Sequence, residues 1–320
     1  MRTAVIIPTY RRPECLLQTL EDLRAQSQAA DEIVVVDQDA RHAAEEAERV
    51  RELCTELGAT LLEPSWSQLP RARNLGLAAI TAGLVVFIDD DVRLPSDFLA
   101  AHRACYDDPQ VQAVAGRVFD RQKSDHARRL SGGAQSPAID LLPPEALDPA
   151  IGWFHLDLVH TRLAQWVLTA RGCNMSFRAS FLRQHDLGFD ERFKGTAVRE
   201  ESDICLRLQA AGGRVWYQPA AHLEHLNSPA GGCRPAGRER WADKVAFYHN
   251  HHLMALKSLD ATQRRRFGRA LFRCHALGLP PCNKARRLDL IAGRTAAFLA
   301  GALDARRSLA RLPERTDRAG

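Results

Sequence analysis

The chain has 320 residues, of which 45% are hydrophobic, 26% charged and 7% aromatic, and this globular composition excludes a disordered, collagen-like or disulfide-scaffold protein. The net charge of +5 is uneven: from residue 261 onward there are fourteen basic and four acidic residues, a balance of +10, which leaves −5 for the first 260. A basic region on an acidic body indicates an anionic partner such as a membrane surface or nucleic acid, unless it is simply a solvated helical face.

The cysteine pattern and the hydropathy of the sequence predict the cellular location of the protein. The eight cysteines form no CxxC pair and no cluster with histidine, which argues against a zinc site or a disulfide framework. The N-terminus lacks the features of a signal peptide. The apolar stretch 288–303 is interrupted by Asp289 and Arg294, so it is too polar to span a bilayer and would at most lie on one. We expect a cytoplasmic protein with a peripheral contact at the inner face of the membrane through its basic C-terminal region.

Short apolar runs alternate with helical spacings through the first hundred residues. Strands are predicted over 4–7, 33–36, 60–62 and 84–88, and helices over 16–23, 44–57 and 74–82. This alternation is typical of βαβ units with a parallel sheet. Polar residues follow the strands, and in open α/β sheets ligands bind at the carboxyl ends of the strands.

The regular alternation weakens after residue 116. The segment 131–149 holds two adjacent glycines and four prolines, which predicts a loop or lid. Regular structure is predicted again at 172–178, in a helix over 201–211 and in a strand over 214–217. The remainder is predicted to be helical and basic.

Three consecutive aspartates, Asp89, Asp90 and Asp91, directly follow the strand predicted over 84–88. Adjacent carboxylates repel one another and their pKa values rise unless a cation is near. A helix cap would need only one such residue. Oxygen ligation of this kind suits Mg²⁺ or Mn²⁺, which commonly pair a carboxylate with substrate phosphates. A divalent metal site is therefore favoured.

Six motifs, in this order, resemble the family 2 glycosyltransferases of the GT-A fold: VIIPTY (5–10), VVVD (34–37), RARNLG (71–76), FIDDD (87–91), GCNMS (172–176) and EESD (200–203). The resemblance covers residues 1–227 and implies a mixed, Rossmann-like α/β sheet flanked by helices. Its nucleotide-sugar half would be about 1–116 and its acceptor half about 117–227, followed by a helical basic extension over 228–320. The implied reaction is transfer of a sugar from a nucleoside diphosphate donor to an acceptor hydroxyl with inversion at the anomeric carbon.

The resemblance also implies a nucleotide-sugar pocket, formed by Pro8, Thr9, Tyr10, Asp37, Arg73, Asp89 and Asp90. Pro8 to Tyr10 and Asp37 would surround the base and ribose, although a plain strand-to-helix turn explains Tyr10 equally well. Arg73 would meet the nucleotide or brace the aspartates. Family members often have Asp or Asn after the Asp37 position, whereas this chain has Gln38, so the nucleotide base stays open.

Metal binding is implied for Asp91 as the principal ligand, with support from Asp89. His225 matches a histidine that completes the coordination in many relatives, and His222 is a near competitor. The metal, Mn²⁺ or Mg²⁺, would bridge the donor phosphates and absorb charge as the bond to the sugar breaks.

The acceptor hydroxyl needs a base to take its proton. In the family this base is a carboxylate in a Glu-Asp-x-Asp segment at the start of a helix, and the alignment places Glu201 at its position, with Glu200 and Asp203 as alternates. Acidic residues that merely complement a helix dipole are the competing explanation.

Sequence alone leaves the acceptor and the pathway open. A hydroxyl-bearing glycan, lipid-linked or small-molecule acceptor in glycan, envelope or glycoconjugate biosynthesis is expected. Trp153, Phe154 and Trp166 could stack on an acceptor sugar, but core packing is the simpler explanation. The alternatives are a sugar nucleotidyltransferase, whose glycine-rich phosphate loop is not seen here, and an inactive nucleotide-sugar binding protein. The sequence has no motif of interleaved aromatic and basic residues, so nucleic acid is not an expected partner.

Overall fold

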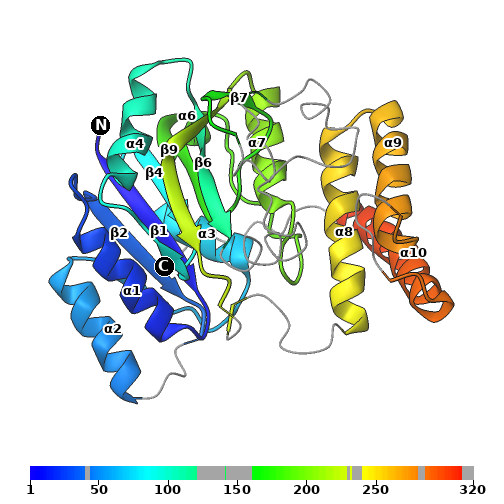
Figure 1. Cartoon of the computed structure of the whole chain (residues 1–320), viewed down its shortest axis with the longest axis horizontal. Coiled ribbons are helices and arrows are strands. Elements are labelled where there is room, and N and C mark those ends of the chain that lie inside the picture. Colours follow the sequence, from blue (N-terminus) through cyan, green and yellow to red (C-terminus); the bar gives the residue numbers. More distant parts are fainter. Residues whose placement is uncertain are drawn as a thin grey trace, which may run out of the picture.

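The computed structural model describes residues 1–39, 44–120, 141, 161–228, 231–232, 240–279 and 285–311. Its described strands form one nine-stranded mixed sheet in the order β3-β2-β1-β4-β8-β6-β9-β5, with β7 paired to β9 (Figure 1). The strands are β1 (Thr3–Thr9), β2 (Glu32–Asp37), β3 (Thr60–Leu62), β4 (Leu84–Ile88), β5 (Val92–Arg93), β6 (Ala113–Asp120), β7 (Gln165–Val167), β8 (Asn174–Arg178) and β9 (Val215–His225). The predicted loop over 131–149, Trp153 and Phe154 lie outside the described residues.

Helices cover both faces of the sheet. The α-helices are α1 (Pro13–Arg24), α2 (Ala44–Glu56), α3 (Leu69–Ala79), α4 (Phe98–Ala104), α6 (Ala179–Gln184), α7 (Glu200–Ala210), α8 (Trp241–Ser258), α9 (Ala261–Leu271) and α10 (Leu288–Ala310). Two short helical turns follow α4 and α9, at Cys105–Asp107 and Phe272–Ala276. The predicted mixed sheet flanked by helices is thereby confirmed.

The parallel strands β3, β2, β1 and β4 form the half of the sheet predicted from the βαβ pattern. Successive residues of a strand point to opposite faces, so Val5 and Ile7 pack with α1, α2 and α4, while Ala4 and Ile6 pack with α3, α6 and α7. Every residue of β1 is buried, which explains its continuous apolar run.

The bounds of β1 and α3 differ from those predicted. β1 continues through Pro8 to Thr9, because β4 pairs only with Thr3–Ile6 and Pro8 therefore needs no N–H for a ladder bond on that side. α3 begins at Leu69 instead of residue 74, with Pro70 in its first turn, where the fixed proline φ favours a helix.

The antiparallel strand β8 lies between β4 and β6, and β9 runs parallel to β6. The register between β6 and β9 shifts after Gly116, where a side chain would clash with Asn174 and with the Ala221 carbonyl. Asn174 is fully buried and donates to the carbonyls of Arg117 and Ala221, so it acts as an internal hydrogen-bonding residue.

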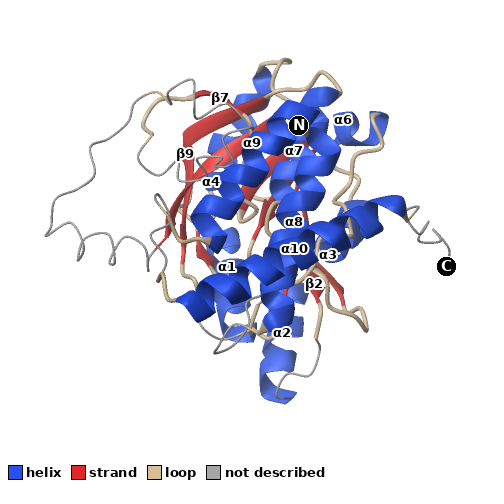
Figure 2. Cartoon of the chain, turned by 90° about the vertical axis from the view of Figure 1, so that its right-hand side faces the viewer, coloured by secondary structure: helices blue, strands red, loops and turns tan. Residues whose placement is uncertain are grey.

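The C-terminal helices α8, α9 and α10 form a layer beside α7, away from the sheet (Figures 1 and 2). Phe193 joins the apolar core of these helices. Lys257 of α8 donates to the carboxylate of Asp203 on α7 at 2.8 Å. The helical character predicted for this region is confirmed, and the domain boundary near residue 227 stays a prediction. No helix among the described residues is long and apolar enough to cross a membrane.

Candidate active site

The strands deliver a set of polar side chains to one edge of the sheet. Asp89 to Asp91 follow β4, and the short strand β5 then pairs antiparallel with the end of β9, with Val92 opposite His225. This pairing brings His225 to the aspartates, although 134 residues separate it from Asp91 in the sequence.

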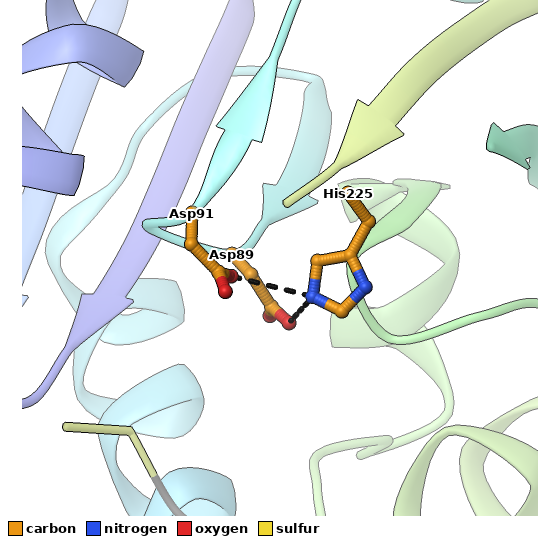
Figure 3. A group of neighbouring side chains, drawn as sticks. All are labelled: Asp89, Asp91 and His225. Carbon is orange, nitrogen blue, oxygen red and sulfur yellow. Dashed lines mark ion pairs between the residues drawn. The ribbon is translucent and has the colours of Figure 1, made fainter. Parts of the chain in front are cut away.

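Asp89, Asp91 and His225 form a compact group with the geometry of a metal site (Figure 3). Nε2 of His225 lies 3.3 Å from Oδ1 of Asp91 and 3.8 Å from Oδ2 of Asp89. The Asp91 side chain is buried, whereas that of Asp89 is 31% exposed and can meet a ligand from solvent. Oδ1 of Asp91 is buried, and its partner in the described part of the chain is Nε2 of His225. Two carboxylates and an imidazole suit a divalent metal.

The other oxygen of Asp91 is fixed by the protein. Oδ2 accepts the backbone N–H of Ser228 at 2.8 Å and lies 3.0 Å from Nη1 of Arg12. Burial acts to raise the pKa of Asp91, but the bond to His225 and the charges of His225 and Arg12 hold it below its ordinary value. The carboxylate therefore stays ionised and correctly turned for a metal.

Asp120, at the end of β6, orients His225. Its Oδ1 lies 3.0 Å from Nδ1 of His225 and accepts from Asn227 at 2.9 Å, while Arg171 binds both carboxylate oxygens. An ionised carboxylate only accepts hydrogen bonds, so Nδ1 donates a proton to Asp120. Burial acts to lower the pKa of His225, but the bonds to Asp120 and Asp91 outweigh it and raise this pKa to about 9. A metal bound between His225 and the aspartates would take the place of the proton on Nε2. Sequence reasoning missed Asp120, although it follows an apolar strand just as Asp37 does.

Asp90 lies apart from the Asp89, Asp91 and His225 group. It is buried, accepts from the Thr9 hydroxyl at 2.7 Å and pairs with Arg12 at 3.1 Å. Burial raises the pKa of Asp90 to about 7, against the opposing effect of Arg12. Arg12, which sequence reasoning also missed, thus neutralises two of the three aspartates. The hydrogen bond between Thr9 and Asp90 therefore stabilises the loop that follows β4 from its buried side.

The other predicted donor-side residues lie along the same edge. Asp37 ends β2 and is buried, and the ring of Tyr10 lies 4.9 Å from the guanidinium of Arg11. The side chain of Gln38 accepts from the backbone of Gln68 at 2.7 Å and donates to the Thr9 carbonyl at 3.3 Å. The residue that departs from the family pattern therefore ties β1 and β2 to the start of α3.

Arg73 connects the group formed by Asp89, Asp91 and His225 to α7. It is almost fully buried in the second turn of α3, and it donates to Asp89 at 3.4 Å and to the Gly172 carbonyl at 2.9 Å. It also forms an ion pair with Glu200, the first residue of α7. The predicted alternative that Arg73 braces the aspartates agrees with these contacts.

The three carboxylates of the EESD motif have different surroundings. Glu200 pairs with Arg73, and Asp203 is fully buried between Arg207 and Lys257, each at 2.8 Å. For Glu201, by contrast, no side chain in the described residues forms a hydrogen bond or ion pair with its carboxylate. Burial raises the pKa of Glu201, partly offset by the positive charges of nearby arginines. Glu201 thus has the uncommitted carboxylate that a general base requires.

Trp166 packs against its neighbours in the core. Its ring lies 4.8 Å from that of Trp216 in an edge-to-face arrangement, and the guanidinium of Arg214 lies 3.5 Å from its centre. Packing accounts for Trp166 without an acceptor sugar.

Residues 4–181 match the sequence profile of glycosyl transferase family 2, which is more than half of the chain. The chain belongs to this family. It is similar to the pre-mycofactocin glycosyltransferase of Mycobacterium tuberculosis, with 31% identity over 177 residues that make up 55% of this chain and 32% of that protein. The chain thus matches about a third of the length of this relative.

The solved structures of two other proteins share the fold. TarS of S. aureus (1–349), solved in complex with UDP-GlcNAc, superimposes with a TM-score of 0.61 at 15% identity, covering 94% of this chain and 82% of TarS. The mannosyltransferase PcManGT of Pyrobaculum calidifontis, in complex with GDP-Man and Mn²⁺, has a TM-score of 0.54 at 19% identity, covering 95% and 86%.

Proposed function

We propose that the protein is an inverting glycosyltransferase that moves a sugar from a nucleoside diphosphate sugar to an acceptor hydroxyl. The observation that carries this proposal is the pair of contacts made by Arg73, which reaches both Asp89 and Glu200. Through these contacts the first turn of α7, with Glu201, lies beside the group formed by Asp89, Asp91 and His225. A cation site next to an uncommitted carboxylate suits transfer from a diphosphate donor.

The residues that would hold the metal are Asp91, Asp89 and His225. Mn²⁺ and Mg²⁺ both suit this donor set, and the imidazole favours Mn²⁺. When bound, the ion supplies positive charge to the diphosphate leaving group. The family membership and the Mn²⁺ named for PcManGT support the assignment.

Glu201 is proposed as the base. It takes the proton of the acceptor hydroxyl as the acceptor oxygen bonds to the anomeric carbon. The bond from that carbon to the donor phosphate oxygen breaks, and the nucleoside diphosphate leaves from the opposite face, which inverts the configuration. The raised pKa of Glu201 fits this task, because a base works best when its pKa approaches the working pH.

The donor pocket is proposed to include Pro8, Thr9, Tyr10 and Asp37 at the ends of β1 and β2, along with Arg73, Asp89 and Asp90. Asp90 and Thr9 would support the pocket indirectly, since their side chains form a hydrogen bond with each other. UDP and GDP sugars, which the two structural neighbours bind, are the first donors to test. The glycan, lipid-linked or small-molecule acceptor, a role in glycan, envelope or glycoconjugate synthesis and the cytoplasmic location with peripheral membrane contact stay predictions.

A donor screen tests this proposal. The full chain is incubated with UDP, GDP and dTDP sugars and Mn²⁺, and released nucleoside diphosphate is measured, since slow transfer to water reveals the donor without its acceptor. Glu201→Gln should keep donor affinity but lose about 10²- to 10⁴-fold in turnover. Normal turnover by Glu201→Gln together with loss in Glu200→Gln or Asp203→Asn would move the base to that neighbour. Activity only with a sugar phosphate and a nucleoside triphosphate would instead identify a nucleotidyltransferase.

A further inference from the structure

One side of α10 is packed against α8. The residues buried on this side recur at helical spacing and are small: Ala297, Gly301, Ala305 and Ser308. A side chain at Gly301 would come within 2.7 Å of the backbone nitrogen of His249, so the two helices are in close contact there. Figure 2 shows α10 lying across α8 on the outside of the C-terminal layer.

The opposite side of α10, its outer face, is apolar and exposed. Its apolar members also recur every three or four residues and are Leu288, Ala292, Ala296, Leu299, Leu303 and Ala310, and Arg306 lies on the same face near its end. Leu288, Leu299 and Leu303 are 85%, 57% and 54% exposed, so nothing in the described ranges covers them. A helix that is apolar on two opposite sides is normally enclosed on both. An exposed apolar stripe of this length marks an interaction surface.

Basic residues lie at both ends of the outer face. Arg286 and Arg287 precede Leu288, and Arg306, Arg307 and Arg311 lie at the other end of the helix, all exposed. The helix α9, which packs against α8, carries further exposed arginines, which are Arg264, Arg265, Arg266 and Arg269. The exposed acid on α10, Asp289, is paired with Arg287. The outer face is therefore apolar in its middle and basic at both ends.

We propose that the outer face of α10 lies on an anionic membrane surface. Leucines would enter the boundary between headgroups and acyl chains while the arginines meet lipid phosphates, as in interfacial helices. A second copy of the chain fits less well, because the same arginines would face one another across a symmetric contact and repel. The inference names the face that makes the peripheral contact, and it goes beyond the sugar transfer and does not depend on it.

Vesicle binding by the full chain tests this inference. Sedimentation with phosphatidylglycerol and phosphatidylcholine vesicles is compared with sedimentation with phosphatidylcholine alone. The variant Leu299→Ser with Leu303→Ser removes apolar contact, and Arg306→Gln with Arg307→Gln removes charge. The matched control, Arg49→Gln with Arg51→Gln, removes the same charge from α2, which lies at the far end of the molecule (Figure 1).

We expect salt-sensitive binding to the anionic vesicles only. The leucine variant should lose at least tenfold in affinity, and the arginine variant about 30-fold, from about fivefold for each surface arginine. The control should bind like the wild type, and all variants should keep the wild-type melting temperature and donor hydrolysis. Absence of binding, or equal binding by the four proteins, would overturn the inference. So would a dimer, seen by light scattering, that the leucine variant converts to a monomer.

Discussion

Asp120→Asn is expected to weaken Mn²⁺ binding although Asp120 is not itself a predicted ligand. The carboxylate accepts from Nδ1 of His225 at 3.0 Å, so the Nε2 atom, which faces Asp91, is the nitrogen that gives up its proton when a metal binds. Asparagine keeps the shape but carries an NH₂ group that can donate to Nδ1 and shift the proton to Nε2. Nε2 would then be unable to bind a metal.

The expected loss in Mn²⁺ affinity is 10- to 100-fold, which is typical when a metal-bound histidine loses its carboxylate partner and corresponds to about 1.4–2.7 kcal/mol. Calorimetric titration of Mn²⁺ without donor measures it directly. Glu56→Gln, an exposed carboxylate on α2, serves as a control with the same change in charge. The reasoning is refuted if Asp120→Asn binds Mn²⁺ like the wild type while His225→Ala does not bind it.

Three further changes test other parts of the structure. Asp91→Asn should cost several kcal/mol of transition-state stabilisation in donor turnover with an unchanged circular dichroism spectrum, and full activity of the wild type in EDTA would contradict the metal assignment. Gly301→Leu should overpack the contact between α8 and α10 and lower the free energy of unfolding by about 1–3 kcal/mol in denaturant melts, whereas Gly268→Leu, which meets open space, should have little effect. Burial lowers the pKa of His102 to about 4, so the folded state favours its neutral form and stability should fall as pH drops from 6.5 to 4; unfolding measured across this range should show a flatter slope in His102→Gln, and an identical slope would exclude His102 as the cause.

The sequence predicted the first half of the fold well, because the patterns that define its strands and helices are local. The strands at the centre of the sheet are buried on both faces, so they appear as unbroken apolar runs, and the polar residues that follow them lie at the ligand edge. Asp37, Asp89 and Asp91 were located in this way. Their positions depend only on where a strand ends.

The far end of β9 shows what local patterns miss. The strand was predicted only over 214–217, yet it continues to His225. Pro219 marks an apparent end, but the register shift passes from Gln218 to His222, so Pro219 lies in the irregular part of the ladder where its missing N–H is harmless. This shift depends on the partner strand β6, which is about a hundred residues away.

Arg12 and Asp120 were missed for a related reason. Both act through partners that are distant in the sequence: Arg12 through Asp90 and Asp91, and Asp120 through His225 and Arg171. The partners of an arginine after a strand, or of an aspartate at a strand end, cannot be predicted until the order of the strands in the sheet is known.

The EESD motif illustrates how neighbouring carboxylates acquire different roles. Successive helical residues point about 100° apart, so Glu200, Glu201 and Asp203 leave the first turn of α7 in three directions. Glu200 points to Arg73 on the donor side, and Asp203 points to Lys257 of the C-terminal layer. Both carboxylates are neutralised, and together they hold the helix from two sides. Glu201, the proposed base, is the member of the motif without such an ion pair among the described residues, and its placement depends on the ion pairs of the two residues that the alignment offered as its alternates.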